Sequence, residues 1–187
     1  MFIQTELTPN PETLKFLPGR VVMKEGTAFF QKDQNDFSNS PLAQRLFKIE
    51  GVSGVFFGSD FITITKENNI TWDIIKPELL GSITTHYENK EELIIASEET
   101  KKSSKDDQED SEIVKQIKDL INERVRPAVA MDGGDIIYND FEDGIVYLKM
   151  QGACSGCPSS TATLKMGIEN MLKHYIPEVQ EVRPVDA

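Results

Sequence analysis

The chain contains two cysteines, Cys154 and Cys157, which stand three positions apart in the stretch GACSGCPSST. A pair at this spacing can cycle between dithiol and disulfide, or it can supply part of a metal site. The thiolate is the reactive form in both chemistries, so the surroundings of the loop matter as much as the pair itself. The neighbouring elements therefore have to indicate which chemistry the loop supports.

The cysteine loop is predicted to join the end of a strand to the start of a helix at Pro158. Backbone N–H groups without partners at a helix start stabilise negative charge, either on a thiolate or on an anionic metal–sulfur cluster. Gly152 and Gly156 leave room for backbone amides beside both sulfurs. Further donors are the hydroxyl groups of Ser155, Ser159, Ser160 and Thr161. The loop thus favours an anionic sulfur site.

Three interpretations compete with a metal–sulfur cluster. The cysteines could be small core residues, although the loop is polar and rich in glycine. A zinc site needs four ligands, and His174 lies far along the following helix while His86 lies in the other half of the chain, so two chains would have to share the zinc. A dithiol–disulfide oxidoreductase would need a larger sheet, with a proline-bearing strand that faces the pair. These alternatives stay open at this point.

An iron–sulfur cluster is the leading interpretation. A [4Fe–4S] cluster takes four thiolates, and one chain supplies two. Two chains that meet at their cysteine loops would supply all four, which implies a homodimer with an exposed and easily released cluster at its interface. Such a site suits a carrier better than a permanent redox centre.

Composition excludes several other functions. The formal charge is −11, from 31 acidic and 20 basic residues, which disfavours binding to nucleic acid. The chain has no run of about 20 apolar residues that could span a membrane and no basic cluster for a membrane surface. Its first residues resemble neither a signal peptide nor a presequence. We therefore expect a cytoplasmic, bacterial protein, although a mature organellar protein without its presequence would have the same features.

The chain is predicted to have two domains. Residues 97–111, SEETKKSSKDDQEDS, are all polar or charged and cannot bury enough apolar surface to offset the entropy of ordering. We interpret them as a flexible linker between domains at residues 1–96 and 112–187; the alternative is a long solvated loop within one domain. The fold class is α+β, with two small mixed domains.

The pattern of the N-terminal domain predicts mixed elements without catalytic groups. FIQTEL, VVM and AFF favour strands, and VSGVFFG with FITITK favours a hairpin. NPETLKFLPG has the signals of a short helix, with Asn10 as N-cap, Pro11 at the first position and Pro18–Gly19 as the end. SPLAQRLFKIEG is predicted as a helix capped by Ser40, and TWDIIKPELLGSITTHY as a helix interrupted or shifted near Pro77.

The C-terminal domain is predicted to follow the order α-β-β-α-β. Its first helix, SEIVKQIKDLINERVRP, is capped by Ser111 and ends or kinks at Pro127. The MDGGD turn leads into a hairpin that reverses at Asp143–Gly144. The cysteine loop, the last helix and the strand VQEVRPV follow.

Several stretches resemble one known family. In the C-terminal half, RPAVAMDGGDI, LKMQGACSGCPSSTATLKMGIENML and PEV closely resemble the NifU-like C-terminal domain of Nfu-type iron–sulfur cluster carriers. In the N-terminal half, TPNPETLKFLPG, SPLAQRLFKIEGVSGVFFGSDFITITK and a tryptophan followed by IKP resemble the Nfu N-terminal domain. The resemblance covers nearly the whole chain outside the linker.

The resemblance implies a function and its residues. It maps the cluster ligands onto Cys154 and Cys157, with a labile [4Fe–4S] cluster shared by two chains; whether a [2Fe–2S] form is also carried stays open. It implies a carrier that is not an enzyme, receives its cluster from an iron–sulfur assembly donor protein and passes it to apo client proteins, as a homodimer when cluster-bound.

Other polar or aromatic residues receive structural roles. Asp132 and Asp135 are expected to serve turns and caps, and Gly133 and Gly134 to allow positive φ in the turn. Phe56 and Phe57 are expected in the strand core, and a client-binding surface is their alternative role; Trp72 is also expected in the core.

Overall fold

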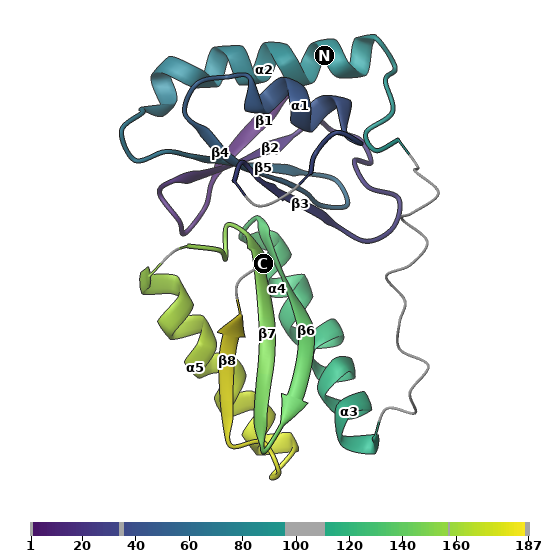
Figure 1. The fold of residues 1–187 in the computed structure, drawn as a ribbon, viewed down its shortest axis with the longest axis vertical. Coiled ribbons are helices and arrows are strands. Elements are labelled where there is room, and N and C mark those ends of the chain that lie inside the picture. Colours follow the sequence, from purple (N-terminus) through teal and green to yellow (C-terminus); the bar gives the residue numbers. More distant parts are fainter. Residues whose placement is uncertain (1, 34–35, 96–110, 157, 186–187) are drawn as a thin grey trace. The chain divides into compact units, whose positions relative to one another are not determined.

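The computed structural model describes residues 2–33, 36–95, 111–156 and 158–185, without the side chains of 158–161. The chain forms two compact units, Met1–Thr100 and Lys101–Ala187, each with its own sheet and helices (Figure 1). This confirms the α+β class with two mixed domains. Except for Ser111, the predicted linker lies outside the described residues, so its boundaries stay predictions. Among the described helices, none has the length and apolar character needed to cross a membrane.

The first unit is an antiparallel sheet with two helices on one face (Figure 1). Its sheet order is β1-β2-β5-β4-β3. The elements are β1 (Gln4–Leu7), β2 (Thr13–Leu17), β3 (Ala28–Gln31), α1 (Pro41–Phe47), β4 (Val52–Phe57), β5 (Ile62–Lys66) and α2 (Trp72–Glu88). The expected hairpin of β4 and β5 is confirmed, as is the cap of α1, where Ser40 Oγ accepts from Ala43 N at 3.2 Å.

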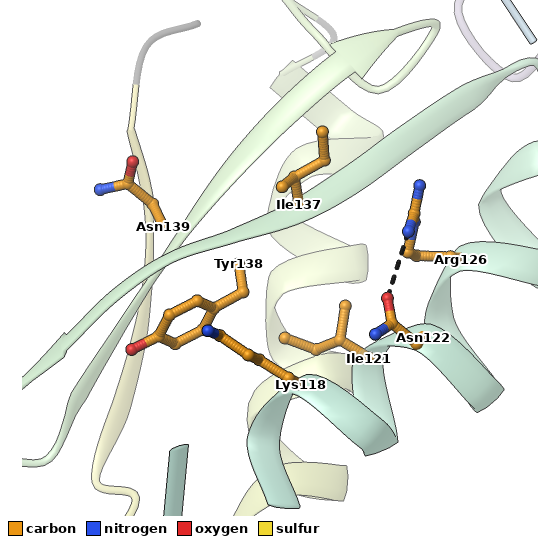
Figure 2. A pocket seen from close by; sticks show the side chains of 7 residues that line it. All are labelled: Lys118, Ile121, Asn122, Arg126, Ile137, Tyr138 and Asn139. Carbon is orange, nitrogen blue, oxygen red and sulfur yellow. Dashed lines mark hydrogen bonds between the residues drawn. The ribbon is translucent and has the colours of Figure 1, made fainter. Parts of the chain in front are cut away.

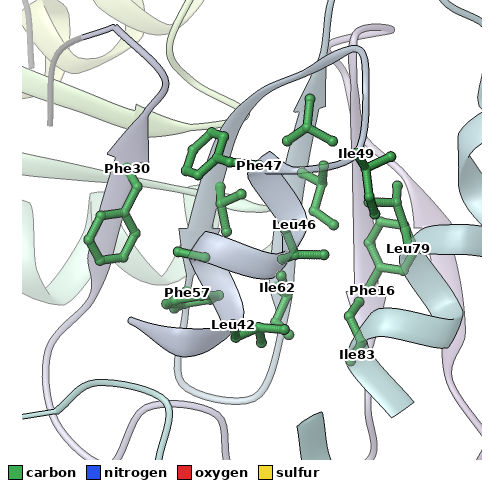
Figure 3. Packing of buried hydrophobic residues seen from close by; sticks show 14 of the residues in the cluster. Phe16, Phe30, Leu42, Leu46, Phe47, Ile49, Phe57, Ile62, Leu79 and Ile83 are labelled. Atoms are coloured by element: carbon green, nitrogen blue, oxygen red, sulfur yellow. The ribbon is translucent and has the colours of Figure 1, made fainter. Parts of the chain in front are cut away.

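The core of this unit lies between the sheet and the two helices (Figure 3). Phe16, Phe57 and Ile62 reach it from the sheet, and Leu46 and Leu79 from α1 and α2; all five are fully buried. Each such side chain contributes about 1.5–3 kcal/mol by leaving water. Phe56 and Phe57 are buried, as expected, whereas Trp72 is only partly buried against this core.

The stretch predicted as a helix from Asn10 is instead the turn before strand β2. Asn10 Oδ1 accepts from Glu12 N at 3.0 Å, and Asn10 O accepts from Thr13 N at 3.0 Å. β2 then pairs with β1 on one side and β5 on the other, and alternate residues Leu14 and Phe16 enter the core. The sheet partners override a local helix signal, because Asx turns and N-caps use the same residue types.

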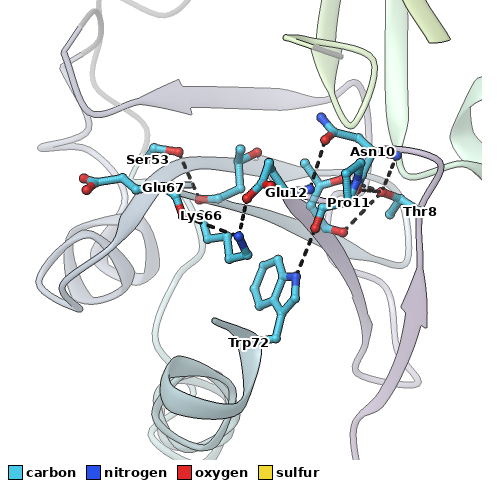
Figure 4. A network of polar contacts seen from close by, with 10 residues as sticks. Thr8, Asn10, Pro11, Glu12, Ser53, Lys66, Glu67 and Trp72 are labelled. Atoms are coloured by element: carbon cyan, nitrogen blue, oxygen red, sulfur yellow. Dashed lines mark hydrogen bonds and ion pairs between the residues drawn. The ribbon is translucent and has the colours of Figure 1, made fainter. Parts of the chain in front are cut away.

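Polar contacts hold this turn in place (Figure 4). Glu12 forms an ion pair with Lys66 of β5, and Trp72 Nε1 donates to Pro11 O at 3.2 Å. The start of α2 is thereby tied to the turn.

Two smaller predictions were also wrong. Val21–Met23 is not a strand, and α2 runs through Pro77 without interruption.

The segment after α2 is fastened to α1 by charged groups. Arg45 Nη2 donates to Glu91 Oε1 at 2.9 Å, buried His86 Nδ1 lies 3.3 Å from Glu91 Oε2, and Ser40 Oγ donates to Leu93 O at 2.7 Å. Hydrogen bonds from Asn89 and Arg45 lower the pKa of Glu91 to about 2, and burial lowers the pKa of His86. The Glu91 carboxylate therefore stabilises the folded state at neutral pH, whereas buried His86 destabilises it as the pH falls below the ordinary pKa of histidine.

We expect this cluster to make the first unit sensitive to acid. The folded-state pKa of Glu91 lies below the ordinary 4.5, so its contribution is present above pH 4.5 and is lost as the pH falls toward about 2. Glu91→Gln should lower the melting temperature by a few degrees at pH 7, and the difference from wild type should shrink below pH 4.5. Trp72, the one tryptophan of the chain, reports this unfolding by fluorescence. A difference that stays constant down to pH 2 would contradict the assignment.

The second unit has the predicted order α-β-β-α-β. Its sheet order is β6-β7-β8, with β6 antiparallel and β8 parallel to β7. Val146, Leu148 and Met150 of β7 are buried in a core shared with the helices. The elements are α3 (Glu112–Leu120), the π-helical turn η2 (Ile121–Val125), α4 (Arg126–Met131), β6 (Gly134–Glu142), β7 (Ile145–Gly152), α5 (Pro158–Tyr175) and β8 (Glu181–Val185).

A π turn lets the first helical segment of this unit pass a proline. Regular helix ends at Leu120, and Arg126 N donates to Ile121 O, five residues back. Pro127 has no N–H and would collide with the carbonyl four residues earlier in an α-helix; the wider turn precedes it. The expected break at Pro127 is therefore replaced by the π-helical turn just before it, and α4 continues to Met131.

Candidate functional site

The cysteine loop lies between β7, which ends at Gly152, and α5, which begins at Pro158. Cys154 is in its described part. Cys157 lies outside the described residues, so its role as a ligand stays a prediction. The predicted strand–loop–helix setting of the pair is otherwise what the structure has.

Cys154 is buried, with 6% of its surface exposed, and packs in the core of the second unit. The expectation that this loop is too polar to be buried was wrong for Cys154, although Gly156 is exposed. The physical reason is a backbone tie: Ala153 N donates to Gly133 O at 3.2 Å, which draws the start of the loop onto the turn before β6. One expected ligand is therefore held inward.

The glycine turn before β6 forms the wall against Cys154. A Cβ added at Gly134 would lie 2.6 Å from Cys154 Sγ and 2.7 Å from Gln151 O, closer than atoms can pack. Gly133 has φ of +84°, as expected, but Gly134 has no positive φ. Gly134 is needed for a close approach to the thiol, not for the turn conformation.

An ion pair fixes this turn from behind. Arg126 Nε donates to Asp135 Oδ1 at 2.9 Å and Nη2 donates to Oδ2 at 2.8 Å, in a two-pronged contact. The hydrogen bonds to Asp135 hold the pKa of the Arg126 guanidinium above its ordinary value. Asp135 is buried and also accepts from Ile136 N at 2.8 Å. The pair joins the start of α4 to the start of β6, next to Gly134. Sequence reasoning gave Asp135 a turn role and did not identify Arg126.

Both halves of the chain match known family models. Residues 3–90 match the model described as scaffold protein Nfu/NifU N terminal, and residues 117–183 match the NifU-like domain. The protein named NFU1 iron–sulfur cluster scaffold homolog, mitochondrial, of Homo sapiens is 51% identical over 99% of this chain and 72% of its own length. The chain belongs to the Nfu family. The resemblance seen in the sequence is thereby confirmed.

A second relative of this Nfu family member comes from a plant. NifU-like protein 5, mitochondrial, of Arabidopsis thaliana is 51% identical over 97% of this chain and 67% of its own length. The solution structure of a NifU-like protein from Saccharomyces cerevisiae matches 52% of this chain and 87% of that chain, at 31% identity and a TM-score of 0.47. The prediction of a bacterial cytoplasmic protein was wrong, because these close sequence relatives are named as mitochondrial. Composition could not separate the two locations.

The Nfu chain also has a pocket of about 210 Å³ between η2 and β6 (Figure 2). Arg126 reaches it and donates through Nη1 to Asn122 Oδ1 at 3.2 Å, while Lys118 lies 5.1 Å from the centre of the Tyr138 ring. The described thiol of Cys154 is not among the groups that line it. The candidate site is therefore the loop surface and not this pocket.

Metal-binding side chains do not gather elsewhere in the part of the chain that the structure describes. Among those residues, no three of His, Cys, Asp and Glu lie close enough to hold one ion. His86 is buried beside Glu91 in the first unit, and His174 stacks edge-on against Tyr175 near the end of α5. The two histidines considered for zinc thus have other surroundings.

Proposed function

We propose that this Nfu protein is an iron–sulfur cluster scaffold and carrier, in which two chains hold one [4Fe–4S] cluster through Cys154 and Cys157 of each. It takes the cluster from an assembly donor and delivers it to apo client proteins, without catalytic turnover of its own. The close relative from Homo sapiens is named as an iron–sulfur cluster scaffold, which supports the cluster as cargo. We place the protein in the mitochondrion, as both relatives are named; cell fractionation with a specific antibody tests this.

One observation carries the proposal: the chain has two cysteines, both in this loop. A [4Fe–4S] cluster needs four thiolates, so a single chain leaves it half coordinated. The start of α5 beside the loop favours the negative charge of a thiolate-bound cluster. The Gly133–Gly134 turn and its Arg126–Asp135 support hold Cys154 inward in the cluster-free chain, so we propose that the loop turns outward when Cys154 binds the cluster.

Delivery follows from the exchange of ligands. In each step a client thiolate forms a bond to one iron as a carrier thiolate leaves that iron, and the released carrier thiolate takes up a proton. Each exchange forms one iron–sulfur bond and breaks one, so no electron is transferred and no other reagent is consumed. With two ligands per chain and two chains, four such steps release the intact cluster.

The test is metal analysis with a mass measurement on the same sample. After anaerobic reconstitution, we expect about two irons and two sulfides per chain in a protein of dimeric mass, measured by light scattering. Zinc at about one per two chains in a colourless dimer would replace the proposal with a zinc-bridged interaction module. A metal-free monomer that cycles between dithiol and disulfide would replace it with an oxidoreductase.

A further inference from the structure

The outer face of α5 is an exposed helix surface without charge. It consists of residues that are all exposed and span the two and a half turns after the cysteine loop: Ala162, Thr163, Met166, Gly167 and Asn170. Met166 is 64% exposed, and a Cβ placed on Gly167 would meet nothing within 4 Å. These residues fall on one side of the helix, because positions three and four apart are neighbours.

The charged residues of the same helix segment point toward β8 instead. Lys165 Nζ lies 3.6 Å from Glu181 Oε1. Glu169 accepts from Val182 N at 3.0 Å and from Lys173 Nζ at 2.7 Å. Because these contacts keep Lys165 and Glu169 at the side of the sheet, the outer face stays uncharged although 27% of the residues in the chain are charged.

Two copies of this chain repel each other as wholes, since each carries a formal charge of −11. A shared cluster nevertheless requires the start of α5 in one copy to approach the start of α5 in the other. The contact with the smallest electrostatic repulsion is one that brings no further like charges together. The outer face of α5 meets this condition, and its small residues allow two helix axes to come close.

We propose that, when two copies share a cluster, the outer face of α5 packs against the same face of the second copy. This rests on the proposed function and names the protein surface that completes the site. The contact is symmetric, with Met166 of each copy near the two-fold axis. The face is about 12 Å long and about 10 Å wide, on the order of 120 Å², well below the roughly 800 Å² per partner that stable interfaces bury. The dimer therefore holds while the cluster is bound and separates after delivery.

The first test places a like charge in the centre of the face. In Met166→Glu, two carboxylates would face each other across the axis. We expect the dissociation constant of the reconstituted dimer to rise about tenfold or more. Sedimentation measures this, with iron content on the same fractions. The matched control is Gln116→Glu, which adds the same charge at an exposed position on α3 and should leave the dimer unchanged. The apo form of Met166→Glu should melt as wild type does, because the side chain is exposed.

The second test uses a photo-crosslinking amino acid at position 166, with position 116 as control. We expect a covalent dimer from position 166 in the cluster-loaded protein only. Equal dimerisation of Met166→Glu and wild type, or crosslinks from 166 to an apo client and not to a second copy, would overturn the proposal. A wild-type protein that takes up no cluster would instead refute the proposed function, so the two failures are distinguishable.

Discussion

Replacing Cys157 by serine is expected to reduce the iron retained after reconstitution and desalting to less than a tenth of the wild-type content. A serine hydroxyl does not ionise at neutral pH and is a poor ligand for iron, and a dimer of the variant offers two thiolates where the cluster takes four. Cys154→Ser should have the same effect on iron. Iron and sulfide analysis, with the visible absorption of the cluster, measures both variants.

The controls separate ligand loss from damage to the fold. Ser155→Ala, between the two cysteines, should keep its cluster. Cys154→Ser places a hydroxyl in a site that is 6% exposed, so we expect it also to lower the free energy of unfolding by about 1–3 kcal/mol. Cys154→Ala avoids that polar group and should lose the cluster with a smaller change in stability. A Cys157→Ser protein with full iron content would remove this residue from the ligand set.

Removing the cation of the Arg126–Asp135 pair is expected to lower the free energy of unfolding more than neutralising its carboxylate does. Arg126→Met leaves the buried Asp135 carboxylate without its cation, and we expect a loss of about 3 kcal/mol, at the lower end for broken buried pairs because Arg126 is 36% exposed. Asp135→Asn keeps an oxygen for Ile136 N and leaves Arg126 access to water, so we expect about 1 kcal/mol. Chemical denaturation followed by circular dichroism measures both.

A matched variant and a double variant sharpen this test. Arg183→Met removes an exposed pair with Glu181, so it should change the free energy of unfolding far less than Arg126→Met does, because solvent screens an exposed pair. Arg126→Met combined with Asp135→Asn should be more stable than Arg126→Met alone, because no buried carboxylate remains. Hydrogen exchange should place the loosened segment at Gly133, Gly134 and the start of β6. Equal losses for Arg126→Met and Asp135→Asn would show that the buried carboxylate does not determine the cost.

Much of this fold could be predicted because its local signals agree with its tertiary contacts. Ser40 and Ser111 cap the helices that they were expected to cap, and Asp143–Gly144 reverses the second hairpin with φ values of +50° and +79°. The prediction of a helix from Asn10 was wrong because the residue types there suit an Asx turn as well as a helix start. Only the pairing of β2 with two neighbouring strands decides between them.

The place of the cysteine loop between a strand and a helix was predictable, and its support was not; the ligand role of both cysteines stays a prediction. Two cysteines at this spacing are visible in any printed sequence. The Arg126–Asp135 pair joins residues from a helix and a strand, and no spacing rule reports that their side chains meet. The burial of Cys154 likewise depends on Gly134, whose missing side chain makes room for the sulfur. Both the Arg126–Asp135 contact and the burial of Cys154 depend on tertiary packing, which the sequence pattern does not reveal.

If Cys154 is a cluster ligand, as we propose, its inward position biases the carrier toward the cluster-free state. In the structure described, the thiol is covered by core residues, so binding requires a conformer in which the loop has turned outward. The apparent dissociation constant for the cluster equals the intrinsic one divided by the fraction of chains in that conformer. On that proposal, Cys154 would return to the core when a client takes the cluster, and the free energy of its reburial would oppose recapture. Substitutions that favour the outward conformer would therefore make the protein bind its cargo more tightly and deliver it more slowly.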